Sequence, residues 1–86
     1  MENFTSIEGP VEMFEGNLAL LIPLEAGGEI LSQYTRGIGE VDGDFLRIII
    51  PPFLAENLGL TEGSMVTVDN ADDKFNIYPQ VFETEP

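Results

Sequence analysis

Residues 47–63, RIIIPPFLAENLGLTEG, constrain the fold more than any other part of the chain. An apolar run ends at Pro51-Pro52, and a proline suits the first turn of a helix because its φ is near the helical value and no donor is needed there. Residues 53–58 then have room for barely two helical turns, since Gly59 supplies a left-handed stop and Leu60 the apolar contact that usually follows one. A strand and a helix this short cannot form a stable core by themselves.

The residues before this stretch predict a β-hairpin. Residues 38–41 lead into Asp42-Gly43, a strong hairpin signal because a type I′ turn needs positive φ at both central residues, and residues 45–50 return. Two more strands are predicted at residues 64–69 and 75–78. The residues expected in the core or in a dimer interface are Ile48, Ile49, Ile50, Leu54, Leu58, Val66 and Val68.

The first 36 residues predict an additional hairpin. A short strand at residues 11–14 precedes a turn, and residues 18–25 are apolar enough for a strand that is covered on both faces. Pro23 lacks a backbone donor, which favours an edge or a bulge, and residues 29–36 are expected to form the returning strand. Residues 1–10 are polar, so we expect a frayed terminus or, alternatively, a short partner-binding arm.

The two halves of the chain show a weak internal similarity. EGNLALLIP at residues 15–23 resembles DGDFLRIIIP at residues 42–51 if one residue is inserted. Two explanations remain open, an old duplication and chance similarity between apolar strands.

The charge of the chain limits its partners. The chain has sixteen acidic residues and only three basic ones, Arg36, Arg47 and Lys74, which gives a net charge of −13. Nucleic-acid binding depends mainly on Lys and Arg at phosphates, so an acidic surface disfavours it. A basic protein partner, or solubility alone, suits this charge better.

The residue types also argue against an enzyme or a metal site. The chain has no Cys or His, so a thiol nucleophile, an imidazole base and a disulfide are all absent. Asp42 and Asp44 belong to an exposed turn, and the acids at 69, 72 and 73 resemble a calcium loop only loosely. We therefore expect a non-enzymatic protein without cofactor or metal.

No apolar run is long enough for a membrane helix and the first residues lack a signal pattern, so we expect a cytoplasmic protein that does not enter membranes.

Residues 38–79 together resemble the AbrB/MazE superfamily, the swapped-hairpin domains of bacterial transition-state regulators and antitoxins. The resemblance depends on the order and spacing of several marks, which are Gly43, Arg47-Ile48-Ile49-Ile50-Pro51, the short helix, Leu58-Gly59-Leu60, Gly63, Val66, Val68 and the final Pro79. It implies a small barrel in which two copies exchange hairpins, as in swapped dimers.

The resemblance also implies two kinds of partner. DNA-binding members approach DNA with basic residues of the first hairpin, and Arg47 alone matches that role here, beside Glu40, Asp42 and Asp44. Antitoxins of this kind bind a toxin through a long acidic segment after the fold, whereas this chain has only residues 80–86 there. The candidate contact residues for DNA or a protein partner are Arg47, Asp42 and Asp44.

We therefore expect a mostly β homodimer with one short helix. Residues 1–36 form an extension with a hairpin, residues 37–79 the swapped-hairpin domain, and residues 80–86 an acidic tail. The expected function is an antitoxin-like or regulator-like interaction module whose acidic surface binds a basic protein. The alternatives are a DNA-binding repressor acting through Arg47, and a small structural or ligand-binding homodimer, which an apolar pocket in the barrel or dimer interface would favour.

Overall fold

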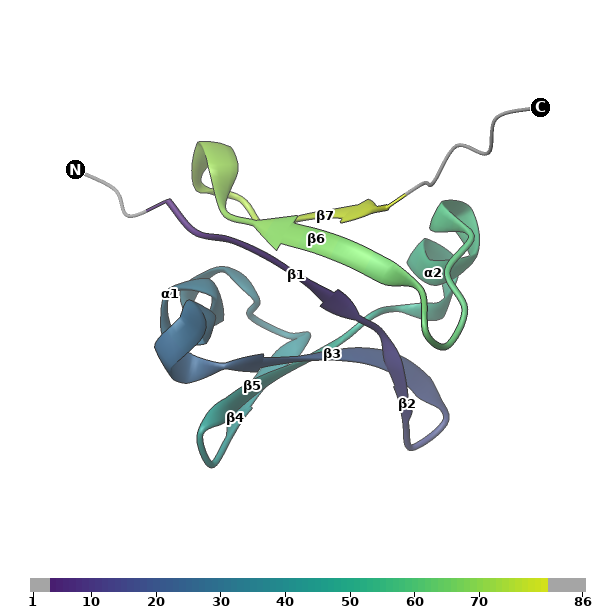
Figure 1. The fold of residues 1–86 in the computed structure, drawn as a ribbon, viewed down its shortest axis with the longest axis horizontal. Helices are drawn as coiled ribbons and strands as arrows, with labels where there is room; N and C mark the ends of the chain where they lie inside the picture. Colours follow the sequence, from purple (N-terminus) through teal and green to yellow (C-terminus); the bar gives the residue numbers. More distant parts are fainter. Residues whose placement is uncertain (1–3, 81–86) are drawn as a thin grey trace.

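Two antiparallel sheets enclose the core in the computed structural model, which describes residues 4–80 (Figure 1). The three-stranded sheet has the order β1 (Ser6–Pro10), β6 (Met65–Asp69), β7 (Asn76–Pro79). The four-stranded sheet has the order β2 (Glu12–Phe14), β3 (Asn17–Pro23), β5 (Phe45–Ile49), β4 (Gly39–Asp42). The helices are α1 (Gly28–Leu31) and α2 (Pro52–Leu58), with 3-10 turns at Leu24–Ala26, Ser32–Tyr34 and Ala71–Asp73. The expectation of a mostly β protein is confirmed.

The prediction that residues 1–10 are frayed is wrong for Ser6–Pro10, which form the strand β1. Ser6–Pro10 pairs with β6, and Ile7 lies opposite Val68 and packs against the core. The chain then turns into the second sheet at Val11, which is fully buried. Its N–H donates to the Ser64 carbonyl at 2.9 Å, which fastens this corner to the loop before β6.

The strand predicted at residues 29–36 is wrong, because residues 29–34 form helical turns. Gly27 has a φ of 114°, which favours glycine and lets the chain turn into α1. Leu31 at the end of α1 is buried, and so is Thr35, which directly follows the 3-10 turn Ser32–Tyr34. Residues 4–80 consequently contain two short α-helices where the sequence predicted one.

The hairpin at residues 38–50 is confirmed, but its turn type is corrected. Asp42 pairs with Phe45, so Gly43 and Asp44 form the loop, and of these two only Gly43 has a positive φ. A glycine at the first central position is typical of a type II′ turn. The pattern of positive φ at both central residues occurs instead at Glu15 and Gly16, between β2 and β3.

One core is shared by residues from both halves of the chain. It contains Val11, Leu20, Ile22 and Leu31 as well as Leu46, Ile48, Ile50, Ala55, Leu60, Val66 and Val68. Leu54 and Leu58 are partly buried against it. Ile49 lies on the opposite face of β5 from Ile48 and Ile50 and is only partly buried.

The four-stranded sheet has an approximate internal two-fold symmetry. Adding 28 to each residue number turns the pair Glu12↔Ala19 into Glu40↔Arg47, and turns Phe14↔Asn17 into Asp42↔Phe45. The central pair Leu20↔Ile48 joins two residues that are themselves 28 apart. The offset of 28 holds for the strands before and after each hairpin turn. The similar segments at residues 15–23 and 42–51 therefore align without the inserted residue that the sequence comparison required.

Candidate interaction surface

The side of the four-stranded sheet that faces away from the core carries the candidate site, which we call the outer face. Alternate residues of a strand point to opposite sides, and Leu20, Ile22, Leu46 and Ile48 point to the core. The apolar residues of the outer face are Phe14, Ala19, Leu21, Phe45 and Ile49. Its charged residues are Glu12, Glu40, Asp42 and Arg47.

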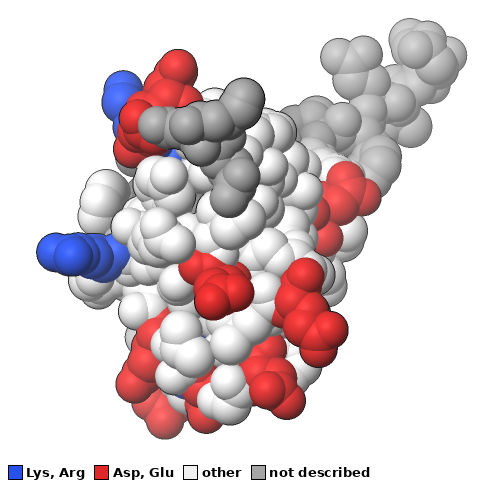
Figure 2. Space-filling model, turned by 90° about the vertical axis from the view of Figure 1, so that its left-hand side faces the viewer, with Lys and Arg blue, Asp and Glu red and all other residues white. Residues whose placement is uncertain are grey.

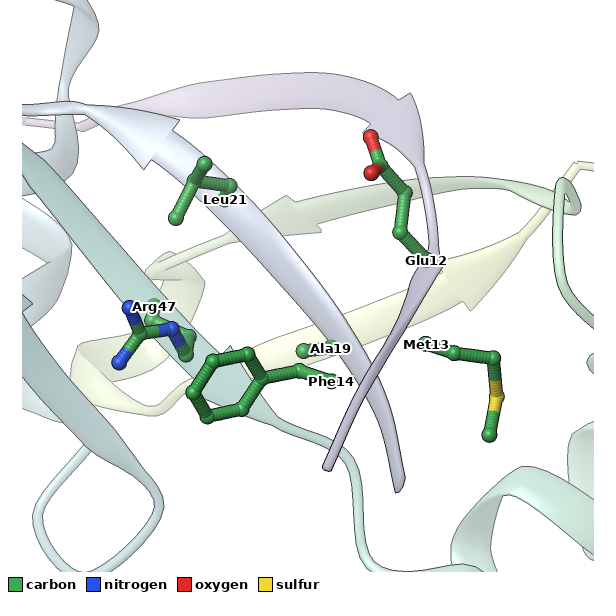
Figure 3. Close-up of a pocket in the computed structure, with 6 residues that line it drawn as sticks. All are labelled: Glu12, Met13, Phe14, Ala19, Leu21 and Arg47. Carbon is green, nitrogen blue, oxygen red and sulfur yellow. The ribbon is translucent and has the colours of Figure 1, made fainter. Parts of the chain in front are cut away.

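Arg47 lies in the middle of the outer face and is engaged by its own chain. Its Nη2 donates to Asp42 Oδ2 at 2.5 Å, and its Nη1 is 3.8 Å from Glu40 Oε1. Its Cζ lies 3.9 Å from the centre of the Phe14 ring, the two side chains being adjacent in Figure 3. The side chain is only 17% exposed. Two carboxylates and an aromatic ring therefore compensate the one positive charge of this surface.

The structure separates the third predicted contact residue from the other two. Asp44 occupies the exposed loop, and its carbonyl accepts a hydrogen bond from the Leu24 N–H at 2.8 Å. Among residues 4–80, the carboxylates that pair with Arg47 are those of Glu40 and Asp42. The hairpin thus brings Arg47 and Asp42 together and leaves Asp44 at its tip.

A small hollow lies beside Arg47 on the outer face. It measures about 140 Å³ and is lined by Glu12, Met13, Phe14, Ala19, Leu21 and Arg47 (Figure 3). Ligand pockets generally measure roughly 300–1,000 Å³, so this hollow suits a single side chain of a partner better than a cofactor.

Sequence reasoning missed the contributions of Phe14 and Leu21. The apolar run at residues 18–25 predicted a strand covered on both faces, but the outer face of β3 is covered only in part, since Ala19 is buried and Leu21 is 51% exposed. An alternation signal was absent because the outward positions are apolar too. Phe14 was assigned to a short strand, and its stacking on Arg47 depends on the β2–β3 and β3–β5 registers.

A second hollow lies on the surface between the β2–β3 hairpin and α2. It measures about 330 Å³, and its apolar lining includes Met13, Leu18, Ile50, Ala55 and Leu60. It reaches the lower limit of typical ligand pockets, but few polar groups converge on it.

The remaining acidic residues do not assemble a metal centre. In the part of the chain that the structure describes, no group of three potential ligands could hold a metal ion. Asp69, the first acid of the loose calcium-loop pattern, accepts hydrogen bonds from the Ala71 N–H at 3.2 Å and from Asn76 Nδ2 at 2.9 Å. Asp69 therefore orders the 3-10 turn between β6 and β7.

Acidic side chains are distributed widely over the molecule. Figure 2 shows them over one side and gathered at its lower end, where the β4–β5 hairpin lies in Figure 1. Within residues 4–80, no helix has the length and apolar character needed to cross a membrane. Comparison of the chain with protein-family models, with curated proteins and with solved structures finds no match.

Proposed function

We propose that the protein is a non-enzymatic, cytoplasmic interaction module that binds a basic protein partner through the outer face. One observation carries the proposal, namely that Arg47 is already neutralised within the chain while two large apolar residues beside it stay exposed. Leu21 is 51% and Phe45 40% exposed, and exposed apolar surface often marks an interaction site.

The charges near the outer face select the kind of partner. Glu12, Glu40 and Asp42 lie at its margins, and the rest of the chain carries an excess of acidic residues. A surface with apolar side chains around a neutralised arginine and with acids at the rim is complementary to a segment with apolar and basic side chains.

We also propose that residues 38–79 correspond to the swapped-hairpin unit of AbrB/MazE-like proteins. The order β4, β5, α2, β6, β7 agrees with that unit, and β3 and β1 of the same chain pair with β5 and β6. The first half of the chain would then take the place of a second copy, as part of an antitoxin-like or regulator-like module.

DNA binding through Arg47 is the alternative that the geometry supports less well. Phosphate would have to compete with Asp42 and Glu40 for the guanidinium. Each like charge about 4 Å from a phosphate costs on the order of 1 kcal/mol even in water.

Fluorescence anisotropy with two labelled probes tests the proposal. The probes are a synthetic peptide of alternating Lys and Leu and a random-sequence DNA duplex, both at roughly 50 mM salt, where electrostatic binding is strong. We expect the peptide to bind and the duplex not to bind. Leu21→Ser should weaken peptide binding by about fivefold, because burial of the exposed half of a leucine side chain is worth roughly 1 kcal/mol.

Tyr78→Ser is the matched control, because Tyr78 is 49% exposed on the other sheet. It should change peptide affinity by less than about twofold. Equal losses in both variants would place the binding elsewhere. Duplex binding that Arg47→Ala abolishes would favour the DNA-binding alternative, and no binding of the peptide would contradict the proposed function.

A further inference from the structure

We infer that the outer face binds one extended segment that carries two basic side chains separated by four positions, with an apolar side chain midway between them. This inference deepens the proposed function and rests on it. It follows from the symmetry of the sheet, the charges at its margins and the spacing of its strands.

The two-fold symmetry places equivalent acids on opposite margins of the outer face. Glu12 on β2 and Glu40 on β4 are related by the offset of 28 residues, and so are Leu21 and Ile49 between them. The Glu40 side chain is 80% exposed in spite of its contact with Arg47, so it remains accessible to a partner. A partner that crosses the sheet from β2 to β4 thus meets Glu12, then apolar side chains, then Arg47, whose charge Asp42 and Glu40 compensate, and finally Glu40.

Charge excludes a second copy of this chain as the occupant. Each copy carries a net charge of −13, and face-to-face contact would bring two sets of Glu12, Glu40 and Asp42 together. Arg47 could not relieve this repulsion, because Asp42 and Glu40 already pair with it. A basic segment meets no such penalty, since its charges are complementary to the rim.

Strand spacing sets the distance between the two basic residues. β2 and β4 are the outer strands of four, and three spacings of about 4.8 Å separate them by roughly 14 Å. Glu12 lies in register with Ala19 and Glu40 with Arg47, so the two acids are also offset by two residues along the strands and their backbones lie roughly 16 Å apart. An extended chain advances about 3.3 Å per residue, so positions one and five lie roughly 13 Å apart with their side chains on the same side, and the long stems of Lys and Arg span the difference. The small hollow beside Arg47 has room for the apolar side chain and lies on the Glu12 side of the path, since Glu12, Ala19 and Leu21 line it.

Selection from a phage-displayed library of random 12-residue peptides against the full chain tests the inference. Enriched peptides are synthesised, and their dissociation constants are measured by fluorescence anisotropy. We compare wild type with Glu12→Gln/Glu40→Gln and with the control Glu29→Gln/Glu62→Gln, which removes two exposed acids elsewhere. Both double variants have the same net charge, so only the location of the lost charges differs.

We expect enriched peptides to carry basic residues four positions apart around an apolar residue. Their dissociation constants should rise at least about tenfold in the Glu12/Glu40 variant and less than about twofold in the control, since charges at a contact matter more than distant ones. Basic peptides that both variants weaken equally, or that lack the spacing, would overturn the inference and leave the proposed function intact. A selection without basic peptides would overturn both.

Discussion

Arg47 matches the position of a DNA-contacting residue in the motif, but its side chain contacts other residues of its own chain. The position of the residue in the strand before Pro51 is what suggested a DNA contact, but the cross-strand register places Glu40 directly opposite it. Asp42 accepts its hydrogen bond and Phe14 covers one face of the guanidinium. The residue therefore links β2, β4 and β5 on the outer face.

Replacing Arg47 with alanine should lower the free energy of unfolding by about 1 kcal/mol. A surface ion pair is worth roughly 0–1 kcal/mol and a cation–π contact about 0.5–1 kcal/mol. Urea denaturation measures the change, with Arg36→Ala as the control for an exposed arginine, expected within about 0.5 kcal/mol. Equal effects of the two substitutions would show that the Arg47 contacts do not form in solution.

β1 is the element that joins the two sheets into one core. Its pairing with β6 brings residues near the beginning of the chain against residues near its end, and Val11 closes the corner. A partner-binding arm would need these residues to be free, whereas Ser6–Pro10 is part of the three-stranded sheet.

Ile7→Ala should therefore destabilise the whole protein, by roughly 1–2 kcal/mol. Ile7 packs against the core but is only partly buried, so the loss should be below the 2–5 kcal/mol typical of fully buried positions. Ser6→Ala is the control, because Ser6 is the exposed neighbour in the same strand and should change stability by less than about 0.5 kcal/mol. Thermal or urea unfolding checks both. Indistinguishable midpoints would contradict the pairing of β1 with β6.

Local signals explain which elements could be predicted from the sequence. The β4–β5 hairpin and α2 are each fixed by residues within the element, namely Gly43 in the turn and Pro52 and Gly59 at the helix ends. The partner of β1 lies some sixty residues away in sequence, and no local pattern identifies it. The segment of α1 was predicted as a strand because Ile30 and Leu31 suit a strand as well as a helix, whereas the Leu31 N–H donates to the Gly27 carbonyl at 3.0 Å, a bond that closes a helical turn.

The outer face was predictable only in part. Arg47 and Asp42 were identified from the hairpin, because neighbouring strands follow directly in sequence. Phe14 and Leu21 depend on β3 lying beside β5, a pairing between the two halves of the chain. An apolar run also cannot reveal whether a second layer covers it.

The whole molecule completes its core within one chain. The resemblance implied a homodimer because residues 37–79 alone have too few strands, but β1 and β3 supply the missing pairings from the first half. The approximate two-fold symmetry of the four-stranded sheet is consistent with an internal duplication in place of two copies.

Light scattering after size exclusion should accordingly give a mass near 9.5 kDa at micromolar concentration. The repulsion between two chains of net charge −13 works in the same direction. The homodimer expected from the resemblance is the competing prediction. A stable dimer that Leu21→Ser dissociates would mean that the outer face binds a second copy, contrary to our account.

A two-dimensional ¹H–¹⁵N NMR titration shows, residue by residue, whether the outer face is the binding surface. The full-length chain is titrated with the tightest peptide from the selection. The backbone shifts that change most should belong to β3 and β5 around Leu21, Arg47 and Ile49, with Glu12 and Glu40 at the margins. Changes centred instead on the hollow beside α2, or on the three-stranded sheet around Tyr78, would contradict binding at the outer face.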